Sequence, residues 1–69
     1  MAREMIYKAL IAKYEAEIAD ANTKISIMMT ESRIIPEHTD ITGEIDKHLD
    51  RMEASQSKMA TLQRSYGIN

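Results

Sequence analysis

The chain has 69 residues, a formal net charge of −2, no cysteine, and three tyrosines as its only aromatic residues. A chain of this length forms one domain at most, and it has neither disulfides nor bulky aromatic side chains to stabilise a large core. It lacks an apolar run of about 18 residues and the basic-then-apolar start of a signal peptide, which favours a soluble, non-secreted, cytoplasmic protein.

Residues 2–33 are predicted to form the first helix, because one set of positions recurs at alternating spacings of four and three residues. These positions are Tyr7, Ile11, Tyr14, Ile18, Ala21, Ile25 and Met28. Leu10 and Met29 widen this stripe. The pattern is typical of a helix that packs along its whole length on another helix. We refer to this stripe and its counterpart in the second helix as the seam.

A second stripe of mostly small residues lies nearly opposite the seam of the first helix. It consists of Ala2, Met5, Ala9, Ala12, Ala16, Ala19, Thr23 and Ser26. Small side chains permit close approach of another helix, so the stripe is a candidate interface. Alanine is also the best helix former and is tolerated on a solvated face. Both interpretations remain open from the sequence.

A turn is predicted at about residues 34–38, around the only proline, Pro36. Proline removes a backbone donor and disfavours helical dihedral angles in the residue before it, so the first helix ends here. Thr39 is the predicted N-cap of the next helix, with Asp40 just inside it, where a carboxylate favours the positive end of the helix dipole. A start at Pro36 itself is the alternative.

The second helix is predicted over residues 39–66, again from a three-and-four rhythm. Its seam positions are Ile41, Ile45, His48, Met52, Ser55, Met59, Leu62 and Tyr66, with Leu49 beside His48. Gly43 weakens the helix near its start, and Gly67 followed by Ile68 predicts a left-handed stop. Two helices of matched length with a short connection predict an all-α, antiparallel two-helix hairpin of coiled-coil type.

Charge is distributed unevenly along this hairpin. Residues 1–14 and residues 55–69 each carry +2, whereas residues 15–54 carry −6. Folding back at Pro36 therefore places the basic segments together at the open end, away from the turn. The candidate basic end consists of Arg3, Lys8, Lys13, Lys58 and Arg64. With Tyr7 and Tyr66 nearby, this end is a candidate for auxiliary nucleic-acid binding.

The cluster of Glu37, His38, Asp40, Glu44 and His48 is the strongest candidate for chemistry. Its spacing matches no zinc or di-iron motif, because the residue three after Glu44 is a lysine. We instead expect Asp40 and Glu37 to stabilise a helix start, His48 to be a half-buried seam residue and Glu44 to be solvated. No phosphate-binding glycine loop and no nucleophile motif is present. The sequence predicts no metal, no cofactor and no enzymatic activity.

Residues 35–50 read Ile-Pro-Glu-His-Thr-Asp-Ile-Thr-Gly-Glu-Ile-Asp-Lys-His-Leu-Asp. At this segment, and over most of its length, the chain resembles small uncharacterised proteins of large contractile-tailed phages, including those of cyanobacteria. The resemblance includes a first helix like Ala9–Ala16, a Glu-His-x-Asp-Ile turn at residues 37–41, and an Ile-Asp-Lys core at residues 45–47. The turn differs, with Ile34-Ile35-Pro36 in place of a glycine-containing sequence. The resemblance implies a viral source and a non-enzymatic role in the host cytoplasm or the virion.

A hairpin with a single seam has little interior, so we expect a homo-oligomer or a larger phage or host partner protein to complete it. The leading hypothesis is an adaptor or inhibitor that acts through helical surfaces. The alternatives are a multicopy virion or assembly component and the nucleic-acid binder described above. The candidate partner surface consists of Ala9, Ala12, Ala16, Ala19, Met29, Glu37, His38 and Asp40.

Overall fold

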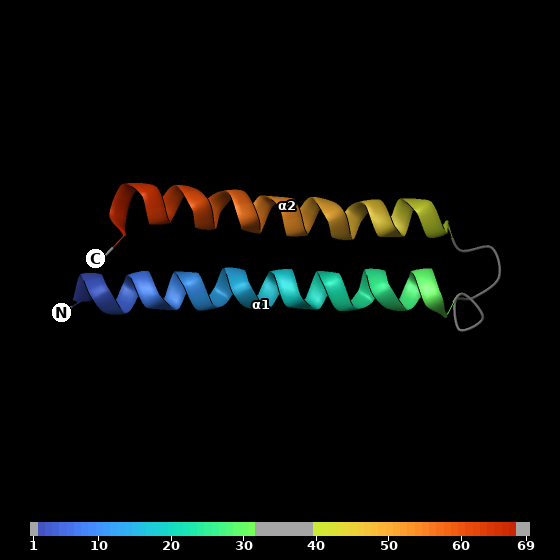
Figure 1. The fold of residues 1–69 in the computed structure, drawn as a ribbon, viewed down its shortest axis with the longest axis horizontal. Coiled ribbons are helices and arrows are strands. Elements are labelled where there is room, and N and C mark those ends of the chain that lie inside the picture. Colours follow the sequence, from blue (N-terminus) through green and yellow to red (C-terminus); the bar gives the residue numbers. More distant parts are fainter. Residues whose placement is uncertain (1, 32–39, 68–69) are drawn as a thin grey trace.

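The computed structural model describes residues 2–31 and 40–67, and within them it contains two helices and no strand. Helix α1 spans Ala2–Thr30 and helix α2 spans Ile41–Tyr66. The helices run antiparallel as a rod about 50 Å long and 15 Å across (Figure 1). The predicted all-α two-helix hairpin is therefore confirmed. We call the end where α1 begins and α2 finishes the open end, and the opposite one the turn end.

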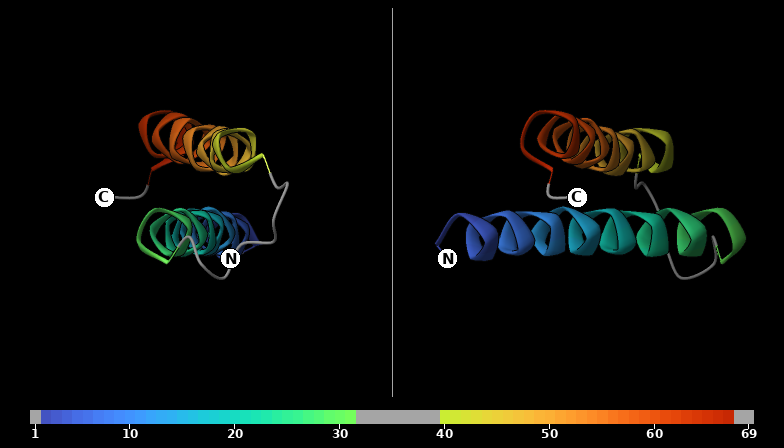
Figure 2. Two further views of the ribbon diagram at one scale, coloured as in Figure 1. Left: turned by 90° about the vertical axis from the view of Figure 1, so that its right-hand side faces the viewer. Right: turned by 60° about the vertical axis from the view of Figure 1, so that its left-hand side comes forward.

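The two helices form a single layer and contact each other, and Figure 2 shows one helix lying over the other with their axes slightly crossed. The seven alternating seam positions of the first helix are all buried or half-buried, and so are those of the second except Tyr66. Met29 and Leu49, which were expected to flank the seam, are exposed. Tyr66 is 58% exposed because it lies in the last turn of α2, beside the first turn of α1. Ala21, at 0% exposure, Ile25 at 8% and Ser55 at 7% are the innermost described residues.

This core is small. Among the described residues no large side chain is completely buried. Ser55 lies in the middle of the seam, and no buried side-chain nitrogen or oxygen in the described part of the chain lacks a hydrogen-bond partner. Most of the hairpin's stability therefore comes from side chains that remain partly in contact with water, which leaves a narrow margin against the entropy cost of folding.

The start of α2 differs from the prediction. Asp40, expected just inside the helix, is its N-cap: its Oδ1 accepts hydrogen bonds from the Gly43 N–H at 3.0 Å and from the Thr42 Oγ1 at 3.1 Å. The carboxylate thereby satisfies a backbone donor that the first turn leaves free. Thr39, Pro36 and the predicted turn lie outside the described residues.

Gly43 lies next to the Asp40 cap and donates its N–H to it. A Cβ atom at position 43 would meet the Asp40 carboxylate, so a larger residue here would require that flexible side chain to shift. The prediction that Gly43 simply weakens the helix overlooked this contact. Here the lower helix propensity of glycine accompanies a capping hydrogen bond.

The far ends of both helices also differ from the predictions. Helix α1 ends at Thr30 rather than 33, although the Glu31 N–H still donates to the Ile27 carbonyl at 2.7 Å. Gly67 has φ −58° and ψ 143°, so the predicted left-handed stop is wrong. The chain leaves α2 in an extended conformation while the Gly67 N–H donates to the Gln63 carbonyl at 3.0 Å. Ile68 lies outside the described residues.

Candidate functional site

One side of the hairpin carries a continuous furrow between the helices, made of three adjoining hollows of about 370, 350 and 290 Å³. The first is the open-end groove, lined by Arg3, Ile6, Tyr7, Leu10, Leu62 and Tyr66. The second is lined by Tyr14, Ser57, Lys58, Thr61, Leu62 and Tyr66. The third is the lysine hollow, lined by Lys13, Tyr14, Glu17, Arg51, Ala54, Ser55 and Lys58. Because neighbouring hollows share residues, we treat them as one side furrow.

Helical spacing explains why these residues share one side. Along α1 the lining residues recur every three or four positions from Arg3 to Glu17, and along α2 they recur in the same way from Arg51 to Tyr66. Residues three and four apart lie above one another on a helix surface. Each set lies just to one side of the seam, so the furrow forms where the two helix surfaces diverge.

The open-end groove exposes apolar side chains. Ile6 is 59% exposed and Tyr66 is 58% exposed at its rim, while Tyr7, Leu10 and Leu62 are half-buried in its wall. The three tyrosines of the chain all line the side furrow. Tyrosine combines a large apolar surface with a polar tip, and it is enriched at protein interfaces. The groove therefore has the composition of a binding surface.

Three cations along the side furrow have no acidic partner among the described residues. Arg3, Lys13 and Lys58 form no ion pair with any residue that the structure describes. Elsewhere, three lysines are paired with acids within one helical turn: Lys8 with Glu4 at 3.3 Å, Lys24 with Asp20 at 2.9 Å and Lys47 with Glu44 at 3.2 Å. Three of the four open-half cations without an ion pair among the described residues thus line the furrow, and the fourth, Arg64, lies outside it.

Arg51 closes the furrow toward the turn end. Its Nη2 donates to Glu17 Oε2 at 2.7 Å and to Asp20 Oδ2 at 2.8 Å, and its Nε also reaches Glu17 Oε2 at 3.2 Å. Its Nη1 lies 3.1 Å from His48 Nδ1. One guanidinium therefore connects α2 to two carboxylates of α1. The fork geometry of arginine suits this paired contact with carboxylates.

These contacts shift the ionisation of the network. Hydrogen bonds from Arg51 and then Lys24 hold the pKa of Asp20 below its ordinary value, and hydrogen bonds to Asp20 and Glu17 raise the pKa of Arg51. At the start of α2, the Gly43 N–H and then the Thr42 hydroxyl lower the pKa of Asp40. Both aspartates are therefore stabilised as carboxylates in the folded chain.

Acidification is expected to weaken the hairpin through these two aspartates. A depressed folded-state pKa means that the unfolded chain binds protons first as pH falls. The stabilisation is complete above the ordinary aspartate value of 3.8 and is lost as pH drops through the lower folded values. Circular dichroism melts at pH 7 and pH 3 should show a smaller acid-induced fall in melting temperature for the Asp20→Asn, Asp40→Asn double variant than for the natural chain. An equal fall would contradict this assignment.

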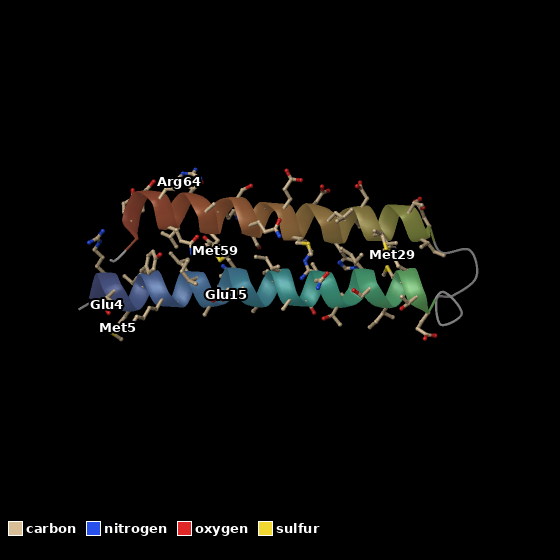
Figure 3. All side chains as sticks on the ribbon, viewed as in Figure 1. Glu4, Met5, Glu15, Met29, Met59 and Arg64 are labelled. Carbon is tan, nitrogen blue, oxygen red and sulfur yellow. The ribbon has the colours of Figure 1, made fainter. Side chains whose placement is uncertain are left out.

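The predicted basic end is divided by the structure. Arg3, Lys13 and Lys58 line the side furrow, whereas Lys8 pairs with Glu4 and Arg64 donates to Thr61 Oγ1 at 3.4 Å. Figure 3 shows Arg64 on the side of α2 that faces away from α1. Three of the five residues of the predicted basic end therefore lie on one surface, the side furrow.

The predicted partner surface is not brought together by the described residues. The four alanines Ala9, Ala12, Ala16 and Ala19 are exposed and line none of the three hollows. Met29 is 68% exposed in the last turn of α1, and Asp40 caps α2. Glu37 and His38 lie outside the described residues. Glu44, expected to be solvated, has a side chain that is 39% exposed and pairs with Lys47 at the surface.

The sequence prediction missed Ile6, Glu17 and Arg51 as members of a site. All three lie one helical step to the furrow side of a seam position, and Ile6 with Leu10 forms an apolar pair four residues apart. That spacing was a usable signal. The link between Glu17 and Arg51 could not be predicted from spacing, because these residues lie 34 positions apart in sequence. Their contact depends on the register between the two helices.

Within residues 2–31 and 40–67, no three histidine, aspartate or glutamate side chains are placed to hold a metal ion. Neither described helix combines the length and apolar character that crossing a bilayer requires. Comparison of the chain with protein-family models, with curated proteins and with solved structures gave no match.

Proposed function

We propose that this protein is a protein–protein interaction module that receives an apolar element of a partner protein in its open-end groove. The observation that carries the proposal is the position of Ile6 and Tyr66, both more than half exposed, at the rim of a groove with an apolar wall. Apolar side chains gathered on one concave surface favour burial against a partner.

The energetics of the groove support a partner that also makes polar contacts. Full burial of a side chain such as isoleucine or leucine contributes about 1.5–3 kcal/mol. Covering the exposed parts of Ile6, Leu10 and Tyr66 therefore contributes on the order of several kcal/mol. Association costs about 4–15 kcal/mol in lost freedom of motion. Arg3, Lys13 and Lys58, which line the furrow, are the charged groups that can add polar contacts with a partner bound in the groove.

A second copy of the chain fits this surface less well than a different protein does. Two open-end grooves that meet face to face would bring Arg3, Lys13 and Lys58 of both copies together. An antiparallel pair would instead set the open-end groove of each copy against the part of the other copy's furrow-bearing side that lies near the turn end. There, Asp20 and Glu44 are already paired with lysines. Sedimentation tests this comparison: a monomer at micromolar concentration supports a different partner, whereas a stable dimer favours the predicted homo-oligomer.

Site-specific photocrosslinking in cells that produce the protein tests the proposal. A crosslinking amino acid at position 6 lies on the groove rim, and one at Glu53, exposed and outside the furrow lining, is the matched control. We expect a discrete protein adduct from position 6 and none from position 53. Absence of an adduct at position 6, or equal adducts at both positions, would contradict the proposal.

The biological setting proposed for this module is phage infection, as an adaptor or inhibitor of a phage or host protein. The support is the resemblance of residues 35–50 to small phage proteins. Infected cells are therefore the first place to perform the crosslinking. Recovery of the chain in purified particles would favour the alternative of a virion component.

Nucleic-acid binding is the second candidate function, because the tyrosines and the unpaired cations share the side furrow. Base stacking requires free ring faces, and Tyr7 and Tyr14 are half-buried, so Tyr66 is the one furrow tyrosine that is more than half exposed. The observations therefore favour a protein partner. Binding of an oligothymidine that falls steeply as salt rises would favour nucleic acid instead.

A further inference from the structure

We propose that the side furrow binds an acidic amphipathic helix of about four turns, which completes a three-helix bundle. This inference rests on the proposed function and specifies the chemistry of the partner. It draws on the length of the furrow, the helical walls that use most of their own backbone groups, and the placement of Arg3, Lys13 and Lys58.

The length of the furrow limits the length of the bound element. The α1 side of the furrow extends from Arg3 to Glu17, which is about 21 Å at 1.5 Å per residue. Beyond Glu17 the Arg51 side chain bridges the helices and ends the lining. A helix of about 14 residues therefore fits the furrow from the open end to this bridge.

The walls of the furrow favour a helix over an extended strand. Both walls are continuous α-helix, so their backbone N–H and C=O groups are used within α1 and α2 except in the first turn of α1 and the last turn of α2 at the open end. A strand in the furrow would leave its own backbone groups without protein partners. A helix satisfies its backbone internally and presents one apolar stripe, which is the requirement of a groove between two helices.

Charge determines which kind of helix fits. Arg3 lies at one end of the furrow, and Lys13 and Lys58 line its other half, each without an acidic partner among the described residues. Glu17 is the one acid in the lining, and it is engaged by Arg51. Arg3 and Lys13 are ten residues apart, which is about 15 Å along a helix. Two acids with the same separation on the partner helix match these cations. Apolar residues between the two acids then face Ile6 and Leu10.

A matched pair of peptides tests this inference. The first is a fluorescein-labelled 16-residue peptide with leucines on one helical stripe and glutamates flanking them, and the second replaces each glutamate with lysine. Fluorescence anisotropy at fixed salt should show the acidic peptide binding at least about tenfold more tightly. Backbone amide NMR shifts should map the acidic peptide to Ile6, Leu10 and Leu62.

Two charge-matched variants separate the furrow from general electrostatics. Lys13→Glu with Lys58→Glu changes the furrow, whereas Lys8→Glu with Arg64→Glu makes the same change in net charge outside it. We expect the first variant to lose at least about tenfold in affinity for the acidic peptide and the second to lose less than about threefold. Circular dichroism checks that both variants remain helical.

The outcomes distinguish the inference from the function on which it rests. Equal binding of both peptides, no binding of either, or equal losses in the two variants would overturn the acidic helix. A crosslinked partner at position 6 would still support the interaction module in each of these cases. Tighter binding of an oligothymidine than of the acidic peptide would overturn the inference in favour of nucleic acid.

Discussion

Replacing Ile25 with alanine is expected to destabilise the hairpin by about 2–4 kcal/mol, because it removes a buried side chain and leaves a cavity. Ile25 is 8% exposed and is one of two buried apolar residues among those described. A small domain has little stability to lose, so the variant should be mostly unfolded near room temperature. Urea titration followed by circular dichroism at 222 nm measures the change.

Ile27→Ala is the matched control for this substitution. It makes the same chemical change in the same helix, two positions away, at a residue that is 40% exposed. We expect it to cost less than about 1 kcal/mol. Where Ile25→Ala proves too unstable to titrate, Ile25→Val should cost about 0.5–1.5 kcal/mol and gives a measurable step. Equal losses at positions 25 and 27 would show that the face bearing Ile27 is also buried, as in an oligomer.

The seam was the most predictable feature of this molecule. The stripe that includes Tyr7 and Ile25 repeats at three and four residues, and only one side of a straight helix can present such a stripe to a neighbour. Local periodicity therefore settles both the presence of two helices and the faces that meet. The structure accordingly buries or half-buries these positions.

The helix ends were less predictable because they depend on local hydrogen bonds. Asp40 and Thr39 are both suitable N-caps by residue type, and the outcome at Asp40 follows from its contact with the Gly43 N–H. Likewise, a glycine at position 67 permits a left-handed conformation without requiring it. The extended exit observed there cannot be inferred from residue type.

The side furrow depends on the register between the two helices, and the periodicity of each helix does not specify this register. The sequence places Lys13 and Lys58 at the basic end, and it does not indicate that both line one hollow with Tyr14. The Arg51 bridge to Glu17 and Asp20 has the same origin. Predicting such a site requires the axial offset of α1 and α2, which many side-chain contacts determine jointly.

Replacing Ala21 with leucine is expected to cost about 1–3 kcal/mol, because it adds three carbon atoms where the helices already meet. Ala21 is completely inaccessible to solvent and has the lowest exposure among the buried residues of the described chain. Helix pairs separated by about 8–10 Å owe that distance to the side chains at the contact. A leucine at position 21 must therefore push the helices apart or adopt a strained rotamer.

Ala19→Leu is the control, because Ala19 lies in the same helix on an exposed face. Leucine and alanine differ little in helix propensity, so this change should alter stability by less than about 0.5 kcal/mol. Urea titration of both variants measures the contrast, and equal effects would contradict close contact at position 21. Separation of the helices also changes the walls of the side furrow, so Ala21→Leu should weaken binding of the acidic peptide while Ala19→Leu leaves it unchanged. A loss of stability at position 21 with unchanged peptide binding would show that the furrow tolerates a shift between its two helices.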